Sequence, residues 1–211
     1  MSRVLSQGET VQKDNLSEHS PPAPPALFGD EATAAHLGIA DLSFLTRFGV
    51  KGAGAANWLE SQGISVPDRP NTWCPLPEGG IVARLGRSEF LIEDSLHFPV
   101  APRLADLGQQ LPPQVYPVLR QDAVIALYGT STGELLLQTC NINFRALSLA
   151  ERPVILTSII GVAVTIIPGE RAGAPFYRIW CDGTFGAYMW RTLLAIAQEL
   201  GGGAVGAEIV L

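Results

Sequence analysis

The sequence predicts an α+β fold, and three observations lead to this class. Strand-like and helix-like segments alternate from residue 37 onward, but in mixed order rather than as regular strand–helix pairs. A hydrophobic fraction of 47% over 211 residues is enough for one sizeable core. The longest apolar run, residues 154–167, is shorter than the ~20 residues that span a bilayer. We therefore expect one α+β domain over residues 31–211, without a membrane span.

The first 30 residues predict an arm without a core of its own. They are polar and then rich in proline, which favours extended backbone, and they end near the apolar pair Leu27 and Phe28. Two interpretations stay open: a frayed tail, or an arm that lies over a partner with Leu27 and Phe28 as its anchors. The N-terminus has no apolar signal-peptide segment, so we expect a cytoplasmic protein.

The first half of the domain predicts one helix among short strands. Ala55, Ala56, Trp58 and Leu59 recur on one helical face, and Gly63 ends that helix. The expected elements are a strand at residues 48–51, a helix at 52–62, a loop at 71–78, and a hairpin of strands at 79–85 and 88–93.

The second half predicts two further helices and the longest strands. Ser131 or Thr132 is a plausible N-cap, and Phe185, Met189 and Leu193 recur at helical spacing, so we expect them to face the core. The expected elements are a short helix among the prolines of residues 99–117, a strand at 118–127, a helix from 132 to 139, one or two strands at 154–167, a strand at 176–180, and a helix from about 184 to 200 that three glycines end.

The charge content argues against a nucleic-acid partner and for protein partners. Only 16% of the residues are charged, against about a quarter in an ordinary domain, and the net charge is −6. The cations form no basic stripe for a phosphate backbone. All but Lys13 and Lys51 of the 14 cations are arginines, which are preferred in interfaces. The charge-poor surface therefore indicates a protein that partners cover.

No motif in the chain predicts a metal centre. His19, His36 and His97 lie in separate segments without paired ligand spacing. The cysteines are widely spaced, so buried free thiols are the simplest interpretation of Cys74, Cys140 and Cys181.

No motif predicts a self-contained active site either. The glycines at residues 52–54 resemble a dinucleotide turn, but the third glycine and the acidic partner are missing, so tight packing is the preferred interpretation. The loop-end carboxylates could do acid–base chemistry, but caps and turns explain them more simply. They are Asp41, Glu78, Asp122 and Asp182.

Aromatic residues gather near the C-terminus. Trp180, Tyr188 and Trp190 cannot all face the same core as Met189 and Leu193. They complete a second cluster or anchor an interface, because Trp and Tyr are enriched at binding hot spots.

An ordered series of short stretches resembles the folate-binding domain of the glycine-cleavage T-protein (aminomethyltransferase) family. The resemblance covers about residues 37–206 and implies a mixed, mainly antiparallel sheet with packed helices, without the family's C-terminal barrel. The stretches are residues 40–43, 48–55, 58–59, 79–82, 84–86, 89–92, 161–164, 176–179, 190–194 and 203–206. Within this family, residues 135–147 and 179–194 are most similar to gamma subunits of heterotetrameric sarcosine oxidases.

Two departures from the family's pattern bear on catalysis. The family's catalytic aspartate follows a glycine pair on a strand, where this chain has Gly79, Gly80 and then Ile81. The family's pterin-binding glutamate follows a tyrosine, where Tyr177 is followed here by Arg178. A guanidinium only donates hydrogen bonds, so it cannot accept the pterin's N–H groups. We therefore expect no catalytic residue in this chain.

The resemblance implies a non-catalytic subunit of a hetero-oligomeric oxidoreductase that demethylates an N-methyl amine. Larger partner subunits would carry flavin or other redox cofactors, and tetrahydrofolate would take up the one-carbon unit elsewhere in the complex. We expect Tyr188 and Trp190 at the partner interface, with Leu27 and Phe28.

Two alternatives stay open. The first is the equivalent subunit of another amine demethylase, such as a dimethylamine-type monooxygenase. The second is a folate-binding one-carbon carrier or aminomethyltransferase-like protein, in which tetrahydrofolate would contact Asn71, Tyr177, Arg178 and Trp180.

Overall fold

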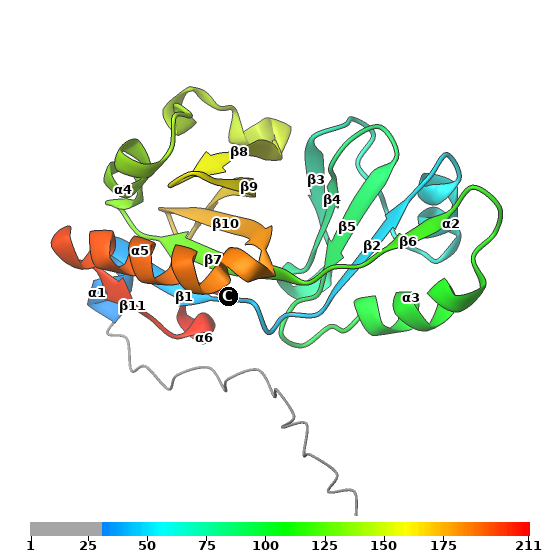
Figure 1. Ribbon diagram of the computed structural model, residues 1–211, viewed down its shortest axis with the longest axis horizontal. Helices are drawn as coiled ribbons and strands as arrows, with labels where there is room; N and C mark the ends of the chain where they lie inside the picture. Colours follow the sequence, from blue (N-terminus) through cyan, green and yellow to red (C-terminus); the bar gives the residue numbers. More distant parts are fainter. Residues whose placement is uncertain (1–30) are drawn as a thin grey trace, which may run out of the picture.

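The computed structural model describes residues 31–211, which form two β-sheets with helices on their outer faces (Figure 1). The first sheet has six strands, and its pairs are antiparallel except for the parallel pair of β11 and β1. Its strands in spatial order are β11 (Gly203–Ala204), β1 (Gly38–Asp41), β7 (Asp122–Tyr128), β10 (Ala174–Asp182), β9 (Val162–Arg171) and β8 (Ile155–Ile159).

The second sheet has five strands and is antiparallel throughout. In spatial order they are β3 (Thr72–Pro75), β4 (Ile81–Arg84), β5 (Glu89–Glu93), β2 (Arg47–Lys51) and β6 (Tyr116–Val118). All five lie in sequence between β1 and β7, which pair with each other in the first sheet. The chain therefore leaves the first sheet after β1, builds the second sheet, and returns as β7.

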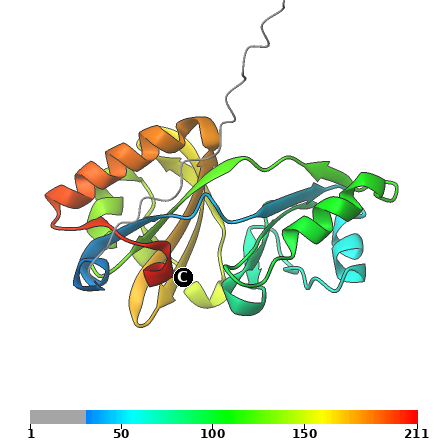
Figure 2. The same cartoon turned by 90° about the horizontal axis from the view of Figure 1, so that it is seen from below.

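Helices cover the outer face of each sheet. On the six-stranded sheet these are α4 (Thr132–Thr139) and α5 (Gly186–Glu199), and Figure 2 shows α5 lying along that sheet. On the five-stranded sheet they are α2 (Ala55–Ser61) and α3 (Ala101–Leu107). The remaining helices, α1 (Glu31–Leu37) and α6 (Ala207–Val210), pack beside β1 and β11.

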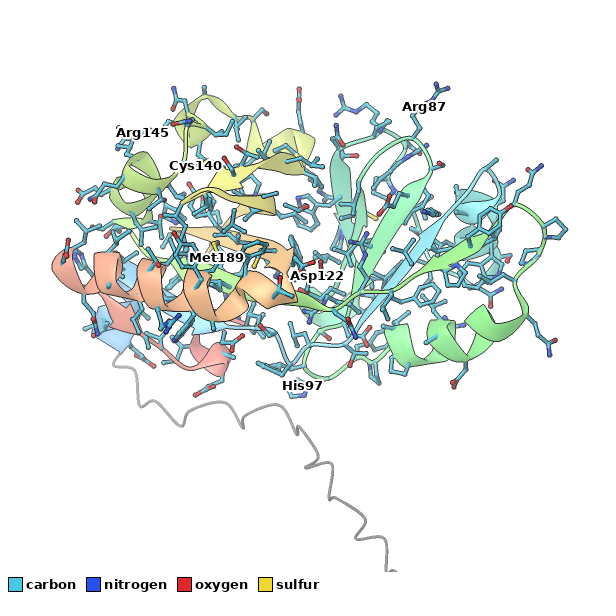
Figure 3. All side chains as sticks on the ribbon, viewed as in Figure 1. Arg87, His97, Asp122, Cys140, Arg145 and Met189 are labelled. Carbon is cyan, nitrogen blue, oxygen red and sulfur yellow. The ribbon has the colours of Figure 1, made fainter. Side chains whose placement is uncertain are left out.

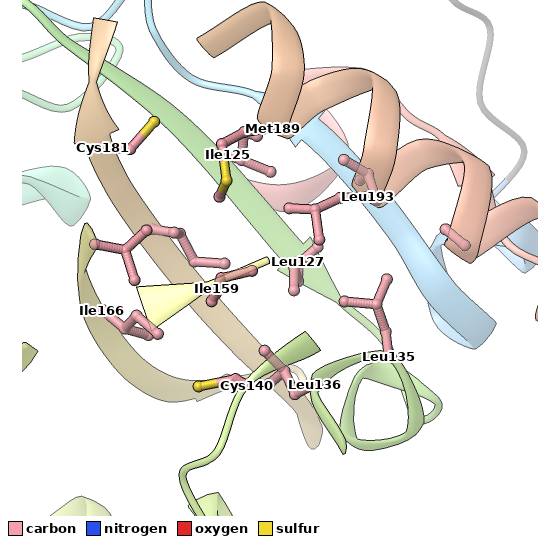
Figure 4. Close-up of a cluster of buried hydrophobic side chains, with 14 of the residues drawn as sticks. Ile125, Leu127, Leu135, Leu136, Cys140, Ile159, Ile166, Cys181, Met189 and Leu193 are labelled. Carbon is pink, nitrogen blue, oxygen red and sulfur yellow. The ribbon is translucent and has the colours of Figure 1, made fainter. Parts of the chain in front are cut away.

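Strand alternation separates the outer cores from a shared inner core. On β7, Ile125 and Leu127 face α4 and α5, where they meet Leu135 and Leu193 (Figure 4). The residues that alternate with them on β7, Val124 and Ala126, face the other way. They pack with Ile81 and Leu91 of the second sheet and with Trp180 of β10. The inner faces of the two sheets therefore meet in one hydrophobic cluster.

A buried ion cluster lies within this inner core. Glu93, fully buried at the end of β5, accepts a hydrogen bond from the Trp180 indole (Nε1–Oε2 2.6 Å) and one from Arg47 (Nη1–Oε2 3.2 Å). Its other oxygen lies 3.2 Å from Arg178 Nη1. Arg47 also donates to the backbone carbonyls of Ser43 and Asp122, on the two segments that cross between the sheets. The cluster therefore ties both sheets and both crossing segments together.

Most of the predicted elements are confirmed, but residues 71–78 were wrongly predicted as a loop. Thr72–Pro75 pairs with β4 as strand β3, after Asn71 adopts a left-handed φ of 56°. Prolines usually argue against a strand, but β3 is at the edge of its sheet, where a missing N–H disrupts no pairing. The same holds for Pro117 in β6, at the opposite edge.

Two further expectations were wrong in detail. The strand predicted at residues 118–127 is divided between β6 and β7, which belong to different sheets, and Leu119 in the crossing between them is 80% exposed. Phe185 does not face the core: it lies in a 3₁₀ turn before α5 and is 48% exposed. The buried face of α5 is formed by Met189, Leu193 and Ala197.

The ion cluster gives a first prediction. Glu93→Gln keeps the shape of the side chain but removes the counter-charge of two buried guanidinium groups. Breaking a buried pair in this way costs about 3–5 kcal/mol, so we expect a loss of this size in the free energy of unfolding in urea. Glu89→Gln is the matched control on the same strand, because its pair with Arg120 is partly exposed and contributes about 1 kcal/mol or less. Equal losses for both variants would contradict the role of the cluster.

Candidate functional site

A cavity of about 240 Å³ opens between the two sheets, beside the ion cluster. Its floor is apolar, with Ile81 of β4 and Ile167 of β9, and its walls include Trp73 of β3 and Phe176 of β10. Arg178 is the buried charged group at this cavity, and Glu170 and Arg171 lie on its exposed rim.

Gly80 explains how the backbone before β4 passes close to the end of β5 at this cavity. Gly80 lies between the 3₁₀ turn Pro77–Gly79 and β4, and its carbonyl accepts a hydrogen bond from the Leu76 N–H at 2.7 Å. A Cβ atom at residue 80 would lie 3.0 Å from the Glu93 carbonyl oxygen and 3.1 Å from Leu76 Cβ. A side chain at residue 80 would therefore require the end of β5 or Leu76 to shift by a few tenths of an ångström.

The buried polar groups at the cavity are hydrogen-bond donors. Arg178 is 6% exposed, and its Nε group makes no hydrogen bond within residues 31–211, whereas its Nη1 group is ion-paired with Glu93 Oε1 at 3.2 Å. The same is true of the Trp73 indole Nε1. Burial lowers the pKa of Arg178, whereas the charge of Glu93 raises it. The guanidinium of Arg152 lies 5.7 Å from the centre of the Trp73 ring.

The two positions at which the sequence departs from the T-protein pattern both border this cavity. Ile81 follows the glycine pair, and Arg178 follows Tyr177. Both positions therefore lack the acid that the family has. A pterin ring needs an acceptor for its amino and ring N–H groups, but Trp73 and Arg178, which line the cavity inside its rim, only donate. The residues at the cavity do not fit the pterin of tetrahydrofolate.

Only one of the four residues proposed to contact folate lines this cavity. Tyr177 points to the opposite face of β10, where its ring packs edge-on against Phe144 at 5.2 Å. It borders a separate outer pocket with Arg145, labelled in Figure 3. Trp180 is buried against Glu93, and Asn71 lies in the exposed turn before β3.

The aromatic residues near the C-terminus divide between core and surface. Trp180 belongs to the inner cluster, and Trp190 packs partly buried against the outer one. Tyr188 is 44% exposed, and its hydroxyl donates to the Ile160 carbonyl at 3.3 Å. Leu27 and Phe28 lie outside the described residues.

The loop-end carboxylates behave mainly as turn residues. Asp41 accepts a hydrogen bond from the Ser43 N–H, and Asp182 accepts one from the Thr184 N–H. Asp122, labelled in Figure 3, begins β7 and lies 3.9 Å from Arg120 Nη1. Glu78 lies in the turn Pro77–Gly79.

The glycine-rich turn at residues 52–54 is explained by packing. Gly52 has a φ of +124°, and a Cβ atom there would run into the backbone carbonyl of Gln114. The close approach of this neighbouring segment is the reason for glycine, as the packing interpretation predicts.

Sequence reasoning missed the buried acid at the centre of the structure. Glu93 alternates with Ile92 and therefore shares a strand face with the apolar Leu91, which was the available signal. A charged residue on the core face of an apolar strand indicates a buried partner. Trp73 was missed because its segment was taken for a loop.

In the described residues 31–211, no helix is long and apolar enough to cross a membrane. The same part of the chain has no group of three or more His, Cys, Asp and Glu side chains placed to hold a metal ion.

The architecture defines the class to which this chain is similar: an α+β fold of the T-protein type. It matches a chain of heterotetrameric sarcosine oxidase from Corynebacterium sp. U-96, solved with pyrrole 2-carboxylate, at a TM-score of 0.63 and 22% identity over 83% of this chain and 92% of that one. It also matches aminomethyltransferase T of the glycine cleavage system from Bartonella henselae, at a TM-score of 0.62 and 14% identity over 83% of this chain. This chain covers 49% of that transferase. No family model and no curated protein sequence matches.

The thiol of Cys181 gives a second prediction. Burial, followed by the charges of Asp122 and Asp182, raises its pKa to about 11. A raised pKa means that the folded state favours the neutral thiol, so at about pH 8 roughly a thousandth of it is the reactive thiolate. We expect the native protein to leave Cys181 unlabelled by a disulfide reagent, with labelling increasing as the pH rises toward that pKa.

Peptide mapping by mass spectrometry checks this expectation. The chain unfolded in urea is the control, because all three cysteines are free thiols and should then react. Labelling of Cys181 in the native protein as fast as in the unfolded chain would contradict the prediction.

Proposed function

We propose that this chain is an accessory, gamma-type subunit of a multi-subunit oxidoreductase that demethylates an N-methyl amine. The observation that carries the proposal is the extent of the structural match. The chain aligns with 92% of one chain from a heterotetrameric enzyme, but with only 49% of the aminomethyltransferase. The extent of this match supports a role like that of the matched chain, rather than that of the longer aminomethyltransferase.

The chemistry of the cavity supports an accessory rather than a catalytic role. Ile81 and Arg178 occupy the two positions at which the resemblance to the T-protein family implies acids. The acid nearest to Arg178 is Glu93, which is buried and hydrogen-bonded to Trp180 and Arg47. A carboxylate held by these partners is a structural group. Redox cofactors and the one-carbon acceptor tetrahydrofolate would therefore belong to partner subunits.

The surface supports protein partners. Large apolar side chains are exposed on several elements, and only 16% of the chain is charged. Two of them, Phe185 and Tyr188, lie one helical turn apart at the start of α5 and are 48% and 44% exposed. Aromatic side chains of this kind are typical of interface hot spots.

The assembly itself is the third prediction. Pull-down of the tagged full-length chain from its source organism should recover larger subunits, and the complex should absorb visible light through their redox cofactors. Light scattering after size exclusion measures the mass, and a spectrum identifies the cofactor. A stable monomer that recovers no larger subunit would overturn the proposal.

The start of α5 allows a sharper version of this test. Phe185→Ala with Tyr188→Ala should weaken assembly by about 30-fold or more, the effect of losing hot-spot aromatic residues. Leu137→Ala on α4 is the control, because this side chain is also exposed, at 71%, on a different helix. If the control weakens assembly as much, α5 does not form the interface.

Tetrahydrofolate provides the fourth prediction. The cavity's buried side chains offer the pterin no acceptor, so we expect no rise in the melting temperature of the isolated chain at millimolar tetrahydrofolate. A bound ligand would stabilise the folded state by mass action, which makes thermal unfolding a direct test. A concentration-dependent rise would favour the folate-carrier alternative.

A further inference from the structure

We propose that the cavity lined by Trp73 and Arg178 is a binding site for a small carboxylate with an apolar or aromatic body. The site is distinct from the proposed accessory function and does not depend on it. It follows from the donors at the cavity, from the charge of the buried cluster beside it, and from the apolar surfaces that surround it.

The unpartnered donors come from two different strands. Trp73 Nε1 belongs to β3, and Arg178 Nε belongs to β10 of the other sheet. Arg178 Nη1 is not among them, because it is ion-paired with Glu93 Oε1 at 3.2 Å. Buried N–H groups without an acceptor cost free energy, so native structures rarely retain them without a ligand or water. An anionic oxygen acceptor satisfies such donors most strongly, because charge-assisted hydrogen bonds are about twice as strong as neutral ones.

The buried ion cluster has an excess of positive charge. It contains two guanidinium groups, Arg47 and Arg178, and one carboxylate, Glu93. The next acid in the chain, Asp94, faces away and accepts hydrogen bonds from the Val100 and Ala101 N–H groups at the start of α3. A carboxylate bound at Arg178 would balance the second guanidinium.

The volume and the lining of the cavity indicate how large the ligand is and which chemical groups it carries besides its carboxylate. The volume of about 240 Å³ lies just below the range of drug-sized sites, which favours a small molecule. Ile81 and Ile167 provide an apolar floor, and the Phe176 ring lies 5.7 Å from the Arg178 guanidinium. Glu170 and Arg171 on the rim carry opposite charges, so the net positive charge at the cavity comes from the buried cluster. A flat apolar body with one carboxylate suits these surfaces.

Benzoate and its neutral analogue benzamide are the probes. The full-length chain, labelled with ¹⁵N at its four tryptophan indoles, is titrated with each compound and followed by NMR. We expect benzoate to move the indole signal of Trp73 and to leave that of Trp58, which lies in the outer core of the second sheet. Benzamide should bind at least tenfold more weakly, because it lacks the charge that strengthens the hydrogen bonds.

Two variants locate the site. Trp73→Phe keeps an aromatic ring but removes Nε1, and should weaken benzoate binding about tenfold by calorimetry, whereas Trp58→Phe should leave it unchanged. Arg178→Met should abolish benzoate binding. If the Arg178→Met variant does not fold, the Trp73→Phe variant still tests the site.

The proposal fails if millimolar benzoate moves no Trp73 signal, if benzamide binds equally well, or if both tryptophan variants bind alike. These results are independent of whether partner subunits are found, so this site and the proposed function can fail separately.

Discussion

The structure depends on how Glu93 is neutralised between the two sheets. Its carboxylate is fully buried and contacts Trp180, Arg47 and Arg178, which come from both sheets. A charge in a low-dielectric core is tolerated only with partners of this kind. Because Arg47 also donates to Ser43 and Asp122 carbonyls, the same cluster holds the two segments along which the chain passes between the sheets.

Arg178 belongs both to this ion cluster and to the lining of the cavity, so the same residue affects the stability of the fold and the charge of the cavity. Arg178 occupies a position at which the resemblance to the T-protein family implies an acid, and its charge is partly compensated by Glu93. Two polar side chains that line the cavity, Trp73 and Arg178, are hydrogen-bond donors. The anion proposed for this cavity rests on these donors, in a fold that is shared with its structural neighbours at 22% and 14% identity.

The sequence predicted the regular parts of the fold well. The hairpin of β4 and β5 and the long helix α5 follow from strong periodicity and from nearby glycines, and helix α4 follows from its N-cap. It failed at β3, where prolines argue for a loop unless the strand is known to be an edge. It also failed at the division between β6 and β7, because nothing local shows that consecutive residues join different sheets.

The sequence by itself determined the α+β class and the residues Ile81 and Arg178 at the two positions where the resemblance implies acids, because each is a property of residue types and their local order. The tertiary structure decided which of those residues meet. It placed Tyr177 and Arg178 on opposite faces of one strand, and it brought Glu93 to Arg178 across 85 positions of sequence (178 − 93 = 85). Such contacts depend on the pairing of distant strands, which local periodicity does not encode.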